Sequence, residues 1–449
     1  MKQLLFLDQL FQKGLRCLKK TRPGRAFRVF AAGMVFTLIF LSIPACSDGS
    51  GSLPVKTSHT AVPSFLHAEG KSLVNENGET VLLRGVNLGN YFIQEFWMGP
   101  TLRTDQVACQ KELEETLLSR FGAEKAEMLL NAYLDHFITE KDLDRIRALG
   151  LNCIRLPVWY GTFTDEEGNR KDDAFARTDR IIEQAAERGL YVILDMHGAY
   201  GSQNGSDHSG IDGRDDKLNA SRFFFGETAE KNQELYYKLW EEIAAHYREE
   251  PAVAGYDLLN EPFCTYRYDS RYGSGELHAL LYPVYDTAYQ KIRAIDDRHL
   301  IIMEAVWDAT DLPKPEKYGW ENVMYEYHNY EYSNYNNENN KQLNSMNRKL
   351  RGIRGEGHDV PSLMGEFNYF NQMDAWTKGL QLLEEAGVSW TFWSYKCMKE
   401  NDNWGILWLD VPKVNAETDS FEKIMDTWSR VDEAEENKPL LDAIRKALE

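Results

Sequence analysis

Two glutamates stand at the ends of apolar runs, where a carboxylate is costly unless it is paired or used. Glu261 follows the run at 253–259, and Glu366 lies near the end of the run at 362–367. If these runs are the fourth and seventh strands of a closed barrel, the two carboxyl groups would face each other across its mouth. One protonated carboxyl could then donate to a leaving oxygen while an ionised one attacks carbon, which is the arrangement that glycoside hydrolysis requires.

The elements that must position these groups are eight short apolar runs that alternate with helical patterns. We expect strands at 81–88, 152–158, 191–196, 253–259, 300–306, 323–327, 362–367 and 388–393. Strands that are apolar on both faces and alternate with amphipathic helices indicate a parallel sheet covered by helices. Eight such units predict an α/β fold with a closed (β/α)8 (TIM) barrel. The first strand lacks a following GxGxxG motif, which argues against a dinucleotide-binding fold.

The helical patterns and one turn complete this prediction. A capping box at 139–142 begins one helix, and Leu235, Leu239 and Ile243 form the apolar stripe of another at 227–249. Further helices are expected at 175–188, 276–295, 341–354, 374–386 and 421–431. Residues 73–81 are typical of a hairpin that turns at Asn77-Gly78 and could plug the bottom of the barrel. We expect one catalytic domain over residues 64–449.

The active site of such a barrel lies at the C-terminal ends of its strands, so the residues there are candidates. Together with the two glutamates they form an ordered set: Arg155, His197, Asn260, Glu261, His328, Tyr330, Glu366 and Trp393. Over residues 73–449 this set resembles glycoside hydrolase family 5 of clan A. The resemblance implies that Glu261 is the general acid/base and Glu366 the nucleophile of a retaining reaction, with carboxyl groups about 5 Å apart.

The same resemblance implies roles for the neighbouring side chains, and we expect neither a cofactor nor a metal. Arg155 and Tyr330 would keep Glu366 ionised and oriented, and Asn260 would hydrogen-bond the sugar 2-hydroxyl. The remaining residues of the set would line the sugar subsite at the scissile bond. They are His197, His328 and Trp393, and the sugar ring would stack on Trp393. Trp97 and Trp404 lie in predicted rim loops and are candidates for further sugar platforms.

Two segments, 83–89 and 197–210, resemble more narrowly the exo-β-1,3-glucanase branch of that family. In that branch, residues that match Glu95 and Asp207 would bind the terminal glucose and help to close the pocket. The chain also departs from the branch: Asn90-Tyr91 stands in place of Gly-Trp, Ser206 in place of an aromatic residue, and His208 in place of an Asn. These changes put the linkage preference and the +1 subsite in question.

Exo action on a neutral β-glucan with β-1,3-linked glucose is therefore the leading hypothesis, and several others stay open. On the same barrel, the enzyme could be an endo-β-1,4-glucanase, a mannanase or a β-1,6-glucanase, depending on whether loops 91–102 and 200–214 leave a groove or a closed pocket. A non-catalytic surface glycan-binding lipoprotein is another alternative, although it would need neither glutamate. A metal-dependent hydrolase would lose activity with a chelator.

Metal ligation finds little support in the spacing of the histidines and cysteines. Asp195, His197 and His208 could suggest a metal, but the first strand lacks an H-x-H pair and no cluster has ligand spacing. The six cysteines are scattered, so we expect single thiols, with one disulfide possible after export. Glu304, at the end of the fifth strand, could be another site carboxylate or a structural one.

The sequence of the N-terminal segment is typical of an export signal. Residues 1–46 hold eight basic residues and one acidic residue, and an apolar run at 30–43 ends shortly before Cys46. This pattern predicts a lipoprotein-type signal peptide with a lipidated Cys46, followed by a flexible tether at 47–63. We expect an exported protein, lipid-anchored to a bacterial membrane at the periplasmic or cell surface or otherwise secreted, that touches the membrane only through this anchor.

The charge of the chain narrows the choice of partners. Its net charge is −19, and the segment after the basic N-terminus is more acidic still. Such a surface repels phosphate backbones, so no nucleic-acid partner is expected. A neutral β-glucan oligosaccharide or polysaccharide is the expected partner, and the protein is expected to be a monomer.

Overall fold

The structure is a computed structural model that describes residues 63–212, 221–264, 273–332, 339–401 and 403–449. Contacts within the chain divide it into Met1–Thr57 and Ser58–Glu449, and all described residues belong to the second unit. The predicted signal peptide and the lipidation site Cys46 lie outside the described residues. Within the described part, no helix combines the length and apolar character that crossing a bilayer requires.

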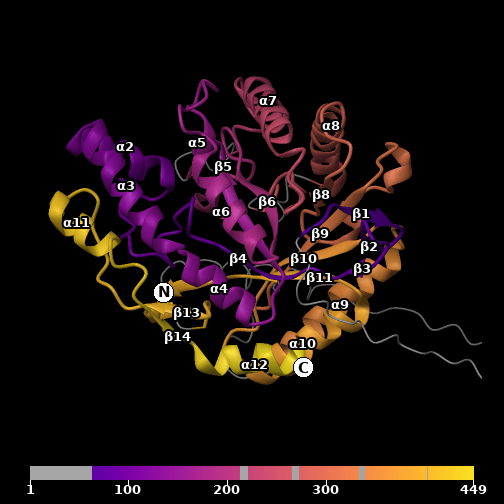
Figure 1. Ribbon diagram of the computed structural model, residues 1–449. Helices are drawn as coiled ribbons and strands as arrows, with labels where there is room; N and C mark the ends of the chain where they lie inside the picture. Colours follow the sequence, from indigo (N-terminus) through magenta and orange to yellow (C-terminus); the bar gives the residue numbers. More distant parts are fainter. Residues whose placement is uncertain (1–62, 213–220, 265–272, 333–338, 402) are drawn as a thin grey trace, which may run out of the picture. The chain divides into compact units, whose positions relative to one another are not determined.

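Eight parallel strands close into a barrel, as the sequence predicts (Figure 1). They follow one another in chain order, and the last strand pairs with the first through Trp390 and Arg84. Their bounds are β4 (Arg84–Asn87), β5 (Cys153–Trp159), β6 (Tyr191–Gly198), β7 (Val253–Asp257), β8 (Leu300–Glu304), β9 (Val323–Asn329), β10 (Ser362–Phe367) and β11 (Ser389–Phe392). Each lies within or overlaps one of the eight predicted runs.

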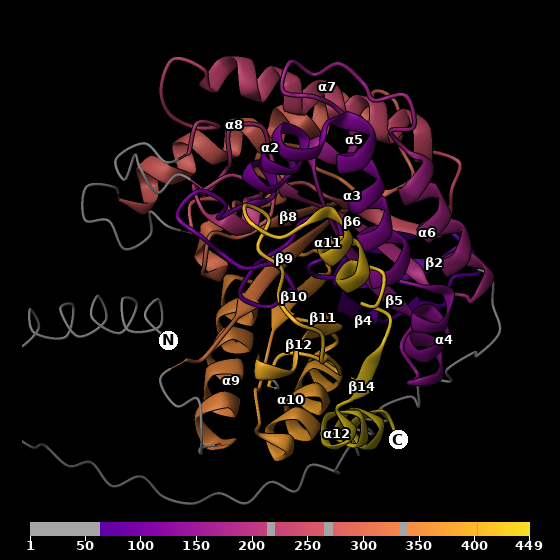
Figure 2. The ribbon, with the colours of Figure 1, turned by 90° about the vertical axis from the view of Figure 1, so that its left-hand side faces the viewer.

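Helices surround this barrel (Figures 1 and 2). The predicted ones are α4 (Glu140–Ala148), α6 (Ala176–Glu187), α7 (Ala229–Tyr247), α8 (Ser274–Arg293), α9 (Asn339–Glu356), α10 (Met373–Ala386) and α11 (Phe421–Trp428). The capping box of α4 is confirmed, because the Asp142 carboxylate accepts from the Thr139 backbone N–H at 2.8 Å. The sequence analysis missed α2 (Gln110–Phe121), α3 (Ala123–Phe137), the one-turn α5 (Tyr160–Phe163) and α12 (Lys438–Leu448).

A small antiparallel sheet closes the N-terminal end of the barrel. The predicted hairpin is present as β2 (Ser72–Asn75) and β3 (Thr80–Val81), with Gly78 at φ 76° in its turn, and β1 (Leu66–Glu69) adds a third strand. Leu66 and Leu73 pack with the first residues of the barrel strands in one apolar cluster: Cys153, Tyr191, Ile193, Ala254, Leu300, Ile302, Met324 and Leu363. The hairpin therefore does plug the bottom of the barrel.

A second small sheet follows the barrel in sequence and was not predicted. It consists of β12 (Lys396–Met398), β13 (Leu407–Leu409) and β14 (Ala434–Glu436). The buried Lys396 ammonium on β12 pairs with the Asp142 carboxylate of α4 at 3.0 Å, which ties this sheet to the first turn of α4. The four cysteines of the described residues, Cys109, Cys153, Cys264 and Cys397, are free thiols.

Candidate active site

Glu366, at the end of β10, is held by two donors from other strands. Arg155 Nη1 on β5 donates to Glu366 Oε1 at 3.1 Å, and the Tyr330 hydroxyl, just after β9, donates to Glu366 Oε2 at 2.9 Å. Both carboxylate oxygens are thus engaged, which fixes their orientation. The side chains are those that the sequence analysis placed around this glutamate.

Arg155 also connects the sugar-subsite candidates. Its Nη2 donates to Asn260 Oδ1 at 2.9 Å, which turns the Asn260 amide nitrogen toward His197 Nε2 at 3.4 Å. Burial lowers the pKa of His197 to about 3, so the ring is neutral and its Nδ1–H donates to Asp195 at 2.7 Å. The His197 ring stacks on Trp393, with centroids 5.4 Å apart. Trp393 therefore lies beside a neutral imidazole, and its role as a stacking floor for the sugar stays a prediction.

Glu261 faces Glu366 from the loop that follows β7. His328 Nδ1 donates to Glu261 Oε1 at 2.9 Å, and one side-chain atom of each of Glu261, His328 and Glu366 lies within 4.8 Å of the others. Burial alone would raise the pKa of Glu261, but the hydrogen bond and charge of His328 outweigh it, so this pKa is lowered. The backbone of Glu261 has φ 43°, a left-handed conformation that its N–H···Glu304 Oε2 bond of 2.5 Å supports.

A layer of buried carboxyl groups beneath this pair extends the predicted site. Arg155 Nε lies 2.9 Å from Asp257 and 3.2 Å from Glu326, and its Nη1 lies 3.0 Å from Asp195. Together with Glu304 these acids are almost fully buried. Six carboxyl groups thus crowd around the cationic side chains of Arg155 and His328: Asp195, Asp257, Glu261, Glu304, Glu326 and Glu366.

The protonation of this layer follows from burial and from the distance to the two cations. Burial raises the pKa of Asp195, Asp257 and Glu304, so these groups hold protons that the same acids in water would lose. Burial also acts on Glu326, but the charges of Arg155 and His328 outweigh it and lower its pKa. The pKa of His328 is raised in spite of burial, because the surrounding carboxylates favour the imidazolium.

Sequence reasoning named Glu304 as an open possibility and missed Asp257 and Glu326. A signal was available for Glu326, because it stands two residues before His328 and side chains at that spacing point to the same side of a strand. The neighbouring strand leaves room for it: a Cβ on Gly365 would lie 1.5 Å from Glu326 Oε1. The glycine before Glu366 is therefore required by the buried acid beside it.

Glu95 lies beside Trp97, and its carboxylate is hydrogen-bonded to that residue. The Trp97 indole N–H donates to Glu95 Oε2 at 2.7 Å, and burial raises the pKa of Glu95 to about 8. Asn90 has φ 68°, and its side-chain oxygen accepts from the Glu95 backbone N–H at 2.6 Å. Asn tolerates this left-handed conformation better than most residues, so Asn90 can replace the expected glycine.

Asp207 begins a short 3-10 helix (Asp207–Ser209) and forms an ion pair with Arg103. Arg103 also reaches Asp212 at 2.6 Å, so the predicted terminal-sugar ligand already has a cationic partner within the chain. Glu95 and Asp207 are both close enough to His208 to help raise its pKa, which burial alone would lower. The two residues thus line the same side of the site as His208.

Aromatic side chains cluster around Trp97, the hydrogen-bond partner of Glu95. Trp97 and Trp404 meet edge to face at 4.9 Å, and Trp404 lies 5.8 Å from Tyr330. They belong to one cluster with Met98, Phe370, Trp393, Cys397 and Trp408. Trp97 and Trp404, which the sequence analysis placed in rim loops, are therefore next to the residues that hold Glu366.

The comparisons with known proteins agree with this geometry. A family model described as Cellulase (glycosyl hydrolase family 5) matches residues 117–399. The chain is a member of glycoside hydrolase family 5. The matched region contains all the strands of the barrel except β4, and it includes both glutamates and each of their predicted partners from Arg155 to Trp393.

Curated relatives of this glycoside hydrolase act on different sugars according to their names. A β-xylosidase of Phanerodontia chrysosporium is 34% identical over 60% of this chain and 52% of its own length. A sporulation-specific glucan 1,3-beta-glucosidase of Saccharomyces cerevisiae is 28% identical over 79% of each chain. A glucan 1,3-beta-glucosidase of Lachancea kluyveri is 33% identical over 51% of this chain and 52% of its own length. Among the three relatives at the head of the comparison, the chain spans about half of each one's length.

Solved structures share the fold at low identity. A rutinosidase from Aspergillus niger superimposes with a TM-score of 0.59 at 16% identity, over 72% of this chain and 95% of that chain. Endo-glycoceramidase II from Rhodococcus sp. gives a TM-score of 0.55 at 19% identity, over 82% and 81%. Both confirm the barrel architecture.

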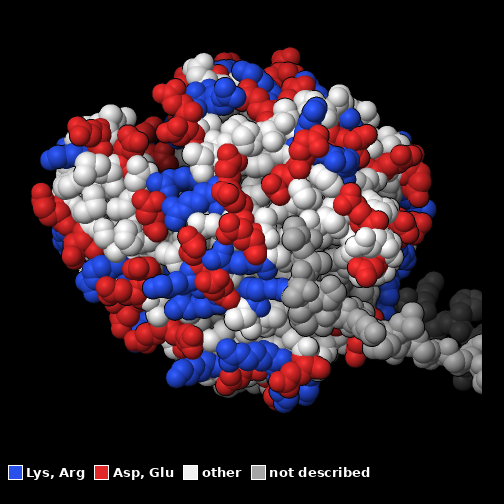
Figure 3. Space-filling model, in the orientation of Figure 1, with Lys and Arg blue, Asp and Glu red and all other residues white. Residues whose placement is uncertain are grey.

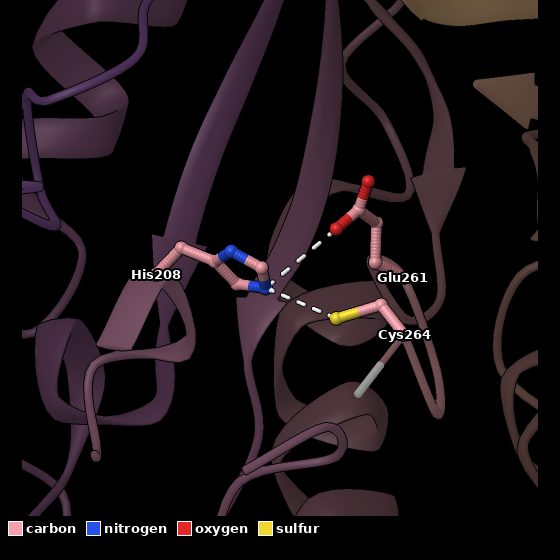
Figure 4. Close-up of side chains that lie close together, drawn as sticks. All are labelled: His208, Glu261 and Cys264. Carbon is pink, nitrogen blue, oxygen red and sulfur yellow. Dashed lines mark hydrogen bonds and ion pairs between the residues drawn. The ribbon is translucent and has the colours of Figure 1, made fainter. Parts of the chain in front are cut away.

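A second convergence of side chains adjoins the glutamates of this family 5 enzyme. His208 Nε2 lies 3.7 Å from Glu261 Oε2 and 3.7 Å from Cys264 Sγ (Figure 4). The sequence analysis considered His208 with Asp195 and His197, whereas the structure pairs Asp195 with His197 and directs His208 toward Cys264. Within the described residues, potential metal ligands converge in this group and in the group of Glu261, His328 and Glu366.

Proposed function

We propose that the protein hydrolyses β-glycosidic bonds with retention of configuration, with Glu366 as nucleophile and Glu261 as acid/base. The observation that carries this proposal is the spacing of the pair, since a carboxylate oxygen of each lies within 4.8 Å of the other. Retaining enzymes hold their two carboxyl groups about 5 Å apart, whereas inverting enzymes need about 6.5–9.5 Å to admit a water molecule.

In the first step, a Glu366 oxygen forms a bond to the anomeric carbon while the bond from that carbon to the leaving oxygen breaks. Glu261 gives its proton to the leaving oxygen. In the second step Glu261 takes a proton from water, whose oxygen attacks the anomeric carbon and frees Glu366. The hydrogen bonds from Arg155 and Tyr330 keep Glu366 oriented for both displacements.

The acid proton belongs to the His328–Glu261 pair in the resting site. The pKa of His328 is raised by the carboxylates around it and that of Glu261 is lowered, so the shared proton resides on His328 Nδ1, 2.9 Å from Glu261 Oε1. Transfer along this hydrogen bond turns Glu261 into the acid that the leaving oxygen needs. A substitution of His328 should therefore slow the first displacement most for substrates with poor leaving groups.

The substrate is a neutral β-glucan, and exo action on β-1,3-linked glucose is the leading assignment within it. Relatives named glucan 1,3-beta-glucosidase support this choice, as does the position of Glu95 and Asp207 beside His208. On the face shown in Figure 3, acidic and basic side chains are interspersed, a surface that suits an uncharged ligand. The β-xylosidase relative makes a β-xyloside the second candidate.

A substrate panel tests this assignment. The purified protein is incubated with laminarin, pustulan, carboxymethyl-cellulose and mannan, and with aryl β-glucoside and β-xyloside, while products are resolved over time. Glucose alone from laminarin is expected. A ladder of oligosaccharides from another polymer would reject the exo-β-1,3 assignment and keep the mechanism, and preference for the xyloside would favour the second candidate. Binding without hydrolysis of any substrate would favour a glycan-binding protein.

Azide tests the role of Glu366 separately. Glu366→Ala should be inactive, and added azide should restore cleavage of an activated aryl β-glucoside and give an α-glycosyl azide, because azide enters from the face that the carboxylate vacated. Glu385→Ala is the matched control, since Glu385 is an exposed glutamate on α10, and it should retain full activity and yield no azide product.

We also propose that the protein is exported and held to a membrane through lipid on Cys46. The basic segment, the apolar run at 30–43 and the position of Cys46 support this proposal. Cys46→Ala should move the protein from the membrane fraction to the soluble exported fraction. An unchanged distribution would reject the anchor.

A further inference from the structure

A nitrogen, a sulfur and an oxygen ligand converge beside the proposed catalytic pair (Figure 4). His208 comes from the 3-10 helix after β6, and Glu261 and Cys264 come from the loop after β7. The His208 Nε2 atom is 3.7 Å from Glu261 Oε2 and 3.7 Å from Cys264 Sγ, and all three atoms lie within 4.8 Å of one another. All three residues are partly exposed, so a solute can reach them.

The two His208 separations fit the edges of a metal tetrahedron. With bonds of about 2.0 Å from zinc to nitrogen or oxygen and about 2.3 Å to sulfur, tetrahedral angles place the ligand atoms roughly 3.3–3.6 Å apart. The observed His208 distances are within a few tenths of an ångström of these edges. Small rotations of the side chains would complete the geometry, and the fourth position would remain open.

We propose that His208, Cys264 and Glu261 form a binding site for a soft divalent cation such as Zn²⁺ or Cd²⁺, and that the bound cation inhibits hydrolysis. The thiolate selects Zn²⁺ or Cd²⁺ over Mg²⁺ and Ca²⁺, which prefer oxygen ligands. Inhibition rests on the proposed function, because the cation occupies the carboxylate assigned as acid/base. Binding itself does not depend on that assignment.

The neighbouring contacts of His208 are compatible with ligation. Asn204 Nδ2 donates to His208 Nε2 at 2.7 Å, which places the lone pair on the nitrogen that faces Cys264 and Glu261. The cation would take over this lone pair at the expense of one hydrogen bond. Asn204 would keep its contact of 3.4 Å with the Glu261 carbonyl oxygen.

The surrounding charge also favours a cation here. The Glu261 and Asp207 carboxylates add negative charge beside His208, as the raised pKa of His208 reflects. The Cys264 thiol is neutral at ordinary pH because burial raises its pKa, so a cation must displace its proton, as metals commonly do at cysteine ligands. The group of Glu261, His328 and Glu366 is a poorer candidate, because it lacks a thiolate and His328 Nδ1 already donates to Glu261.

Binding is tested with Cd²⁺ on the full chain through the ultraviolet charge-transfer band of a thiolate–cadmium bond. Wild type should show a saturable band that Cys264→Ser lacks. Cys109→Ser is the matched control, since Cys109 is a buried thiol at the N-cap of α2, where serine is well suited, and this variant should keep the band.

Inhibition is tested by titrating Zn²⁺ into the hydrolysis assay and comparing each variant with its own metal-free rate. Loss of an outer contact to a metal ligand commonly costs 10–100-fold in affinity, so loss of the Cys264 ligand should weaken inhibition by about 100-fold or more. His208→Gln should weaken it similarly. Mg²⁺ should not inhibit, and a chelator should restore the rate of the Zn²⁺-treated enzyme.

The outcomes separate this inference from the proposed function. No cadmium band in wild type, or an equal band in Cys264→Ser, would overturn the site. A band without inhibition by Zn²⁺ would overturn the inhibitory role. Full turnover by Glu261→Gln would instead reject Glu261 as acid/base, while the cadmium band would continue to test the site on its own.

Discussion

The two ends of the barrel use the same eight strands in opposite ways. On β5, Cys153 belongs to the apolar plug at the N-terminal end, and Arg155, two residues further along, is surrounded by carboxylates. On β9 the same step leads from Met324 to Glu326. A distance of two residues, about 7 Å along a strand, therefore separates a region built for stability from one built for chemistry.

The comparison shows why the bottom of the barrel has to be well packed. Burying six carboxyl groups around Arg155 and His328 carries a large desolvation cost that their mutual attraction repays only in part. Apolar burial of Leu66, Leu73 and the strand starts contributes free energy without any such cost. Substitutions at the two ends should accordingly separate activity from stability.

The largest effect is expected at Glu366. Glu366→Ala removes the proposed nucleophile and should lower kcat by about 10⁴-fold or more. Its free energy of unfolding should change little or increase, because one member of a crowded acidic layer is lost. Steady-state rates and urea unfolding measure the two quantities, and a kcat within tenfold of wild type would remove Glu366 from the mechanism.

Glu261→Gln should have the next largest effect. Loss of the acid/base should lower kcat by about 10²–10⁴-fold for natural glycosides, and less for aryl glycosides whose leaving groups need no proton. Rates on laminarin and on dinitrophenyl β-glucoside provide the comparison. Equal losses on the two substrates would contradict the role of proton donor.

Arg155→Met should affect both activity and stability. The substitution leaves Glu326 and Glu366 without their shared cation, and breaking a buried ion pair in this way costs about 3–5 kcal/mol. Urea unfolding should show this loss, and kcat should fall because Glu366 loses a donor. If the variant is as stable as wild type, the buried carboxyl groups must take up protons and carry no charge once Arg155 is removed.

Leu73→Ala tests the N-terminal end of the barrel, where a substitution should change stability and not activity. Leu73 is 3% exposed in the plug, so its truncation should lower the free energy of unfolding by about 2–5 kcal/mol while kcat at a permissive temperature stays the same. Leu118→Ala on α2 is the control, because Leu118 is 52% exposed and should cost less than about 0.5 kcal/mol. A fall in kcat for Leu73→Ala would show that the two ends are coupled.

The smallest effect is expected at Glu95, whose substitution should change how steeply the free energy of unfolding varies with pH. Its pKa is about 8 in the folded protein against an ordinary value of 4.5, so unfolding between these pH values releases a proton and the free energy of unfolding falls as pH rises. The slope for one proton is at most about 1.4 kcal/mol per pH unit. Glu95→Gln should flatten this decline between pH 5 and 8 in thermal unfolding, and an unchanged slope would contradict the raised pKa.

The sequence predicted the barrel and the main residues of the site because both depend on local patterns. Apolar runs mark the strands, and the polar residue at the end of each run marks the active rim, so Arg155, Asn260 and Glu366 could be placed before any coordinates. The helices α2 and α3 were missed because they belong to the long connection after β4, which the repeating pattern does not cover.

The remainder of the site depends on the way the barrel brings distant residues together. Asp257 and Glu326 lie inside apolar runs, where a charged residue ordinarily speaks against burial, and only closure of the barrel places them around Arg155. His208 and Cys264 are 56 residues apart, and no ligand spacing links them in the sequence. Their proximity arises because the loops after β6 and β7 leave adjacent strands at the same end of the barrel.

The most direct test of the central claim is to locate the covalent sugar intermediate by mass spectrometry. The protein is treated with a 2-deoxy-2-fluoro-β-glucoside that carries an activated leaving group, digested, and its peptides are sequenced. The retaining mechanism predicts one fluoroglucosyl group, esterified to Glu366 and absent from Glu366→Ala. A sugar attached to another residue, or rapid release of the α-anomer without any adduct, would contradict the retaining mechanism with Glu366 as nucleophile.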